Sequence, residues 1–137
     1  MSKPLAGLIL ASVLAGFPVL AQELVKPQVL HDELLKTMPR GEDQQVRVLT
    51  ATFEPGQKTP FHTHRFPVAV YVLEGAFTLE MEGHPVMTMK AGETFIEEPR
   101  VAMTGYNRSA GQTRVVIFYV SDPGTPFLDP VESRTTQ

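Results

Sequence analysis

The chain has 137 residues, which is enough for one domain and not for two. Its net charge is −3 and it has no cluster of Lys and Arg interleaved with aromatic residues, which argues against nucleic-acid binding. It contains no cysteine, so disulfides, thiol chemistry and cysteine-ligated zinc are excluded.

Residues 1–21 have the pattern of a secretory signal peptide. Lys3 supplies a positive charge, residues 5–20 are apolar apart from Ser12, and the small residue Ala21 precedes a polar segment. A membrane anchor is the alternative, but this run is shorter than the roughly 20 apolar residues of a usual membrane span. We therefore expect cleavage after Ala21, export to the periplasm or beyond the cell, and no membrane association of the mature chain.

Residues 22–45 follow as an N-terminal extension with one helix candidate. If His31–Met38 is helical, then Leu30, Leu34, Leu35 and Met38 fall on one face. The sequence thus predicts either a short helix or an extended segment before the main domain.

Residues 46–122 are typical of an all-β domain. Short β-branched or alternating runs are separated by Gly and Pro turns, which favours a sandwich or barrel. No helical stretch is long enough for a parallel α/β sheet. The predicted strands are 46–53, 68–73, 76–82, 86–90, 94–97, 102–106 and 113–120. Residues 123–137 are expected to form a Pro-containing C-terminal tail.

Two histidines between the first two of these strands are the clearest functional signal. His62 and His64 are two residues apart, and residues i and i+2 of a strand point to the same side. An extended backbone would therefore bring both imidazoles to one place, where they could bind a metal ion.

The surrounding residues resemble the cupin superfamily. Gly56-x5-His62-x-His64 followed by residues 71–75, YVLEG, is similar to the first cupin motif. Residues 92–95, GETF, with Pro99, Asn107 and the strand 114–120, are similar to the second. The resemblance implies a small, single-domain, jelly-roll-like β-barrel. Many cupins hold one transition metal with three histidines and one glutamate.

The chain departs from the family pattern at the ligand positions. His62 and His64 match the first two ligands, but the family glutamate falls on Val68 and the third histidine on Met103. A glycine of the second motif falls on Arg100, where a turn glycine often serves a positive φ. Arg100 therefore indicates either a changed turn or a strained one.

The resemblance and these substitutions together predict a degenerate metal site of His62, His64 and Met103. Imidazole with thioether is a soft ligand set that suits copper, and the loss of the carboxylate argues against manganese and oxygenase-type iron. We expect a single transition metal, with copper, zinc and iron as candidates, and a metal-free site as the alternative.

Five further residues are candidates for the pocket around this site. Val68 is expected beside the histidines. Glu97 and Glu98 are strand neighbours, so at most one can point inward, and a solvated pair is the simpler interpretation. Arg100 is either a receptor for an anionic ligand or a surface residue, and Tyr106 either lends its hydroxyl to the pocket or packs.

Three functional classes follow from this site. The first is a barrel that binds a small molecule, with or without a metal. The second is a metal-dependent enzyme such as a dioxygenase, isomerase or lyase. The third is a copper-binding protein. Apolar strand faces would also allow a homodimer, and whether the chain is an enzyme stays open.

Overall fold

The computed structural model describes residues 24–132, and the expected signal peptide lies outside the described residues. Nine strands and no helix are found in this range. The strands are β1 (Gln45–Phe53), β2 (His62–Thr63), β3 (Val68–Glu74), β4 (Ala76–Met81), β5 (Met87–Lys90), β6 (Thr94–Glu97), β7 (Met103–Tyr106), β8 (Thr113–Ser121) and β9 (Asp129–Pro130).

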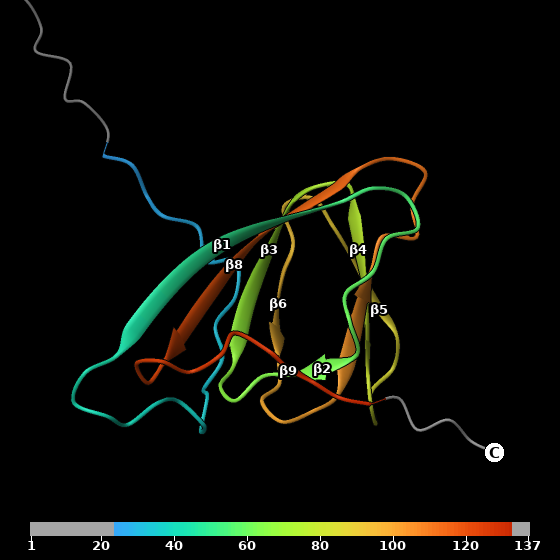
Figure 1. The fold of residues 1–137 in the computed structure, drawn as a ribbon. Helices are drawn as coiled ribbons and strands as arrows, with labels where there is room; N and C mark the ends of the chain where they lie inside the picture. Colours follow the sequence, from blue (N-terminus) through green and yellow to red (C-terminus); the bar gives the residue numbers. More distant parts are fainter. Residues whose placement is uncertain (1–23, 133–137) are drawn as a thin grey trace, which may run out of the picture.

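The strands form two sheets that face each other (Figure 1). One sheet has the order β1-β8-β3-β6 and the other has the order β5-β4-β7-β2-β9. Neighbouring strands in both sheets run antiparallel, and the longest ladder joins β1 to β8, from Gln45↔Ser121 to Phe53↔Thr113. The all-β, jelly-roll-like fold predicted from the sequence is confirmed.

The core lies between the two sheets, because alternate residues of each strand point inward. In β3 the inward positions are Val68, Val70 and Val72, which are all buried. The ring of Phe77 packs against Phe95 from the opposite sheet, with ring centroids 5.7 Å apart. The barrel interior is thus filled largely by apolar side chains, and its polar residues stand out.

A glycine in β7 makes room for this aromatic packing. A Cβ atom added at Gly105 would lie 2.2 Å from Cζ of Phe77, well inside van der Waals contact. Only glycine therefore allows β7 and the Phe77 ring to approach so closely.

Of the two expectations for residues 31–38, a short helix or an extended segment, the structure shows the extended segment. Leu34, one of its expected apolar contacts, is 95% exposed. A short helix is marginally stable unless its apolar face packs on a neighbouring element. The exposed Leu34 side chain packs on none of the described residues, so this stabilisation is missing. The extension lies instead beside the edge strand β6, where the Thr94 hydroxyl donates to the Leu30 carbonyl (3.3 Å).

The C-terminal segment also differs from expectation, because the sheet continues beyond residue 122. Strand β9 pairs with β2 through His62↔Pro130 and Thr63↔Asp129. Part of the expected tail is therefore a component of the barrel wall.

No helix that is long and apolar enough to cross a membrane is found within residues 24–132.

Candidate functional site

His62 and His64 point into the barrel and meet there. Both side chains are buried, with ring centroids 4.7 Å apart and rings nearly perpendicular. The two Nε2 atoms are 3.1 Å apart. The i, i+2 spacing places both imidazoles on one side, as the strand geometry predicts.

Backbone carbonyls fix the tautomer of both rings. Nδ1 of His62 lies 2.7 Å from the Pro60 carbonyl oxygen, and Nδ1 of His64 lies 2.6 Å from that of Phe127. A carbonyl only accepts hydrogen bonds, so each Nδ1 carries a proton and donates it. In their neutral forms the two rings therefore direct lone pairs at each other from Nε2, an arrangement that calls for a proton or a metal ion between them.

Glu97 brings a carboxylate to the same point. Its Oε2 is 3.0 Å from Nε2 of His64, and its side chain is only 8% exposed. Its neighbour Glu98 points outward and lies 3.6 Å from Nε2 of His84. The interpretation as a solvated pair therefore does not hold for Glu97.

The register explains how Glu97 reaches the histidines. Val68 on β3 and Glu97 on β6 are directly paired across antiparallel strands. Directly opposed residues of such strands have side chains on the same face, a few ångströms apart. The carboxylate that the family pattern expects at position 68 is thus supplied from the adjacent strand, beside the buried Val68.

Met103 is close in the ladder but belongs to the core. It pairs with His62 across β7 and β2 and is fully buried within the hydrophobic cluster. It does not line the cavity that His62, His64 and Glu97 share. Met103 therefore has the surroundings of a packing residue, as methionine often does.

The three polar side chains line a cavity of about 90 Å³ inside the barrel. Its other walls are mostly apolar and include Phe53, Val70, Phe77, Ile117, Phe127 and Leu128. At about 30 Å³ for each molecule of liquid water, it has room for roughly three waters or a ligand of a few heavy atoms. Sequence reasoning missed Phe127 and Leu128, since nothing local marks them as wall residues.

Burial sets the charge state of His62. Loss of hydration lowers the pKa of His62 and the nearby His64 lowers it further, while the Pro60 hydrogen bond and Glu97 act in the opposite direction. The net direction favours the neutral imidazole, whose Nε2 is an acceptor or a metal ligand.

The remaining pocket candidates lie outside the cavity. Arg100 is exposed and has φ 64°, and its backbone N–H donates to the His64 carbonyl (2.7 Å). Tyr106 points to the outer face of β7, because it is three residues from the inward-facing Met103 and strand side chains alternate. Of the two expectations for Tyr106, a hydroxyl in the pocket or a packing role, the first does not apply to the inner cavity, which Tyr106 does not line.

The donor set fits a transition metal in its chemistry. Two neutral imidazoles and a carboxylate are ligands of zinc and of non-haem iron. However, the contacts are pairwise, His62 with His64 and His64 with Glu97. No group of three His, Asp or Glu side chains within residues 24–132 is arranged as a complete metal site.

A two-sheet jelly-roll barrel with paired histidines at its inner site defines a cupin-type protein. The family model described as "Cupin domain" matches residues 49–119, more than half of the chain, and the chain belongs to this family. No curated protein sequence matches it.

Solved structures support the same fold. A cupin superfamily protein from Desulfitobacterium hafniense is similar with a TM-score of 0.51 and 10% identity, over 66% of this chain and 100% of that chain. An RmlC-like cupin from Shewanella frigidimarina has a TM-score of 0.51 and 17% identity, over 66% and 86%. The DMSP lyase DddQ from Ruegeria pomeroyi has a TM-score of 0.52 and 20% identity, over 59% of this chain and only 41% of the lyase.

Proposed function

We propose that this cupin is a binding barrel whose inner site takes one divalent transition metal and a small ligand beside it. The observation that carries this proposal is the facing pair of Nε2 atoms, 3.1 Å apart, with a buried carboxylate 3.0 Å from one of them. A site that gathers two acceptor nitrogens and a negative charge in an apolar cavity favours a cation.

The carboxylate changes the expected metal. A His-His-Met set would favour copper, but Glu97 replaces Met103 as the third group on the cavity wall. Two imidazoles with one carboxylate suit zinc or iron(II). We therefore place zinc and iron ahead of copper.

The chain's own residues would orient the ligands and keep bulk water out. The Pro60 and Phe127 carbonyls hold each Nδ1–H, so that Nε2 is the free nitrogen, as outer hydrogen bonds do in many metal sites. The Arg100 amide anchors the backbone of His64. A bound metal would supply Lewis acidity to a ligand in the cavity.

Metal titration tests this proposal and assigns the third ligand. Protein purified without chelator is analysed for metals, and the stripped protein is titrated with Zn²⁺, anaerobic Fe²⁺ and Cu²⁺ by calorimetry. We expect one equivalent of zinc or iron, no binding in His62→Ala, and at least tenfold weaker binding in Glu97→Gln, because loss of a ligand is costly.

Two variants serve as controls for this titration. Glu98→Gln removes an exposed carboxylate next in sequence, and Met103→Leu keeps the core volume without the sulfur. Both should bind zinc within about twofold of the parent. If Met103→Leu loses metal affinity and Glu97→Gln does not, the third ligand is Met103 and the copper-binding interpretation is supported instead. If the parent protein binds none of the three metals, the metal proposal is contradicted and a metal-free binding barrel remains.

A lyase is the second candidate, favoured by the buried pair of His64 and Glu97. A carboxylate beside an imidazole is suited to general-base catalysis, and a DMSP lyase is among the structural neighbours. Incubating the protein with DMSP and following the substrate by NMR tests this candidate. Loss of DMSP that requires both His64 and Glu97 would support it over binding alone.

Export is proposed from the sequence pattern of residues 1–21. The intact mass of protein recovered from its native cell should correspond to a chain that begins at Gln22. A mass that includes residues 1–21 would contradict cleavage.

A further inference from the structure

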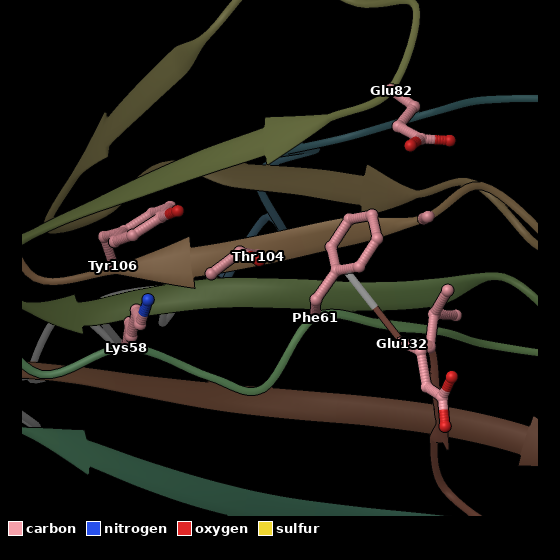
Figure 2. A pocket seen from close by; sticks show the side chains of 8 residues that line it. Lys58, Phe61, Glu82, Thr104, Tyr106 and Glu132 are labelled. Atoms are coloured by element: carbon pink, nitrogen blue, oxygen red, sulfur yellow. The ribbon is translucent and has the colours of Figure 1, made fainter. Parts of the chain in front are cut away.

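A second hollow lies on the outer face of the β5-β4-β7-β2-β9 sheet, outside the barrel. It has a volume of about 550 Å³, within the usual range for ligand sites. Ala102 and Thr104 point outward from this sheet, yet each is only 8% exposed. Outward residues are this well covered because Phe61 and Tyr106 stand beside them, so the hollow is a walled groove (Figure 2).

The two ends of the groove carry opposite charges. Figure 2 shows Lys58 next to Tyr106 at one end, and Glu82 and Glu132 on the far side of Phe61 at the other. Nζ of Lys58 is 6.0 Å from the centre of the Tyr106 ring. Among the ion pairs of residues 24–132, none involves Lys58, Glu82 or Glu132.

Arg108 does not add a second free cation at the Lys58 end. Its guanidinium stacks on Tyr106, 4.3 Å from the ring centre, and is paired with Glu80. This pair holds the Tyr106 ring from one side, and Glu80 also lies close enough to Lys58 to interact with it. Because Arg108 balances Glu80, the net charge is one positive at the Lys58 end and two negative at the end with Glu82 and Glu132.

We propose that this groove binds a short extended peptide with free termini, of three or four residues. Ala102 and Tyr106 are four strand steps apart, or about 13 Å. An extended tetrapeptide spans about 13–14 Å and matches this spacing, while a tripeptide spans about 10 Å and depends on the long Lys58 side chain to reach its carboxylate. The ammonium group lies by Phe61 between Glu82 and Glu132, and the carboxylate lies by Lys58.

The middle of the groove suits a peptide chain between these ends. The Thr104 hydroxyl offers a donor and an acceptor to a peptide group, and the Phe61 and Tyr106 rings offer apolar surfaces for side chains. The ammonium group also gains from the face of Phe61. A polyanion is disfavoured by the carboxylates at the far end, and a neutral sugar would leave both charged ends unused.

The test is a titration of the full-length protein, followed by two-dimensional amide NMR, with tri- and tetra-alanine. Their N-acetylated and C-amidated forms each lack one terminal charge. We expect shifts confined to residues 58–61, 80–82, 102–106 and 131–132. Either blocked form should bind about two- to fivefold more weakly, the usual range for exposed charge pairs.

Variants assign each end of the peptide separately. Lys58→Gln should bind the free and the C-amidated peptide equally, yet still prefer a free amine. The double variant Glu82→Gln/Glu132→Gln should bind the free and the N-acetylated peptide equally, yet still prefer a free carboxylate. The reason is that each substitution removes only the interaction with the peptide charge that it contacts. Thr104→Leu should fill the floor and abolish binding. Lys90→Gln and Glu42→Gln, at exposed sites outside the groove, are matched controls.

Three outcomes would overturn the proposal. The first is no binding of either free peptide at about 10 mM, a concentration that fills most of a site with millimolar affinity. The second is equal binding of blocked and free peptides, and the third is tighter binding of maltotriose at the same residues. The inner site is a separate test, because His62→Ala should leave peptide affinity unchanged in protein that keeps its NMR spectrum.

Discussion

His62 couples the inner site to pH. Its folded-state pKa is lowered by burial, below the value near 6.5 of an unfolded chain. Below pH 6.5 the unfolded state therefore binds more protons than the folded state, and the free energy of unfolding of the metal-free protein should fall as pH falls.

Urea denaturation between about pH 8 and pH 5 measures this effect in the presence of a chelator. Asp129 and Glu80 should not interfere in this range, because Arg65 and Arg108 lower the pKa of each carboxyl. His62→Gln should flatten the curve. A parent protein whose stability stays constant over the whole range would contradict this role of His62.

The histidines of the inner site were predictable, whereas the sequence offered Glu97 and Glu98 as candidates for its carboxylate without deciding that Glu97 points inward. His62 and His64 are marked by a local motif, since strand alternation alone places i and i+2 together. Glu97 is brought to them by the pairing of β3 with β6, a register that one sequence does not reveal. Phe127, 63 residues from His64, was equally beyond local reasoning.

Strand β7 depends on the absence of a side chain at Gly105. Gly105→Ala would place a methyl group against the Phe77 ring, which is buried between Phe53 and Phe95 and has little room to move. We expect a loss of about 1–3 kcal/mol in the free energy of unfolding, as in other overpacked cores.

The companion substitution Phe77→Leu identifies the cause. It shortens the side chain that the new methyl group at position 105 would meet, so the double variant should lose less stability than the sum of the two single variants. Additive losses would mean that the Gly105 effect comes from the strand backbone instead of from the Phe77 contact. Chemical denaturation of the parent, the two single variants and the double variant provides the comparison.

All seven predicted strands are present, as β1 and β3 to β8, while the two-residue strands were not predicted. The predicted bounds agree with the observed ones within about one residue at each end, because alternating or apolar runs separated by Gly and Pro turns mark these strands. Strands β2 and β9 have two residues each, too few to show any period. The apolar spacing in His31–Met38 resembled a helix, but Leu30 and Leu34 stay exposed, so the face that such a helix would bury is not packed.

The whole molecule exposes an apolar sheet face that we propose as a homodimer interface. On the outer side of β1 and β8, Val46 pairs with Val120 and Val48 with Phe118. Val48 is 61% exposed and Phe118 46% exposed. Contiguous exposed apolar surface of this kind usually marks an interaction site, and in a two-fold dimer the same patch of each copy meets the other.

Light scattering after gel filtration measures the mass in solution. We expect a dimer for the parent chain and a monomer for Val48→Glu and Phe118→Glu, because each buries a charge in the interface. Val86→Glu changes an equally exposed valine in the β4–β5 turn and should stay dimeric. A monomeric parent at about 100 μM, above the affinity range of most stable dimers, would rule the interface out.

The pairing of Val68 with Glu97 has a consequence for how such sites are recognised in other sequences. Two residues that face each other across a ladder lie side by side on one face of the sheet, although Val68 and Glu97 are 29 positions (97 minus 68) apart along this chain. A motif written as a fixed spacing scores this chain as lacking its acidic residue, whereas a motif written on strand pairs scores it as having one. When a fixed-spacing motif scores a barrel as lacking its acidic residue, the strand paired with the motif strand should be searched for an inward-facing Asp or Glu before the site is classed as inactive.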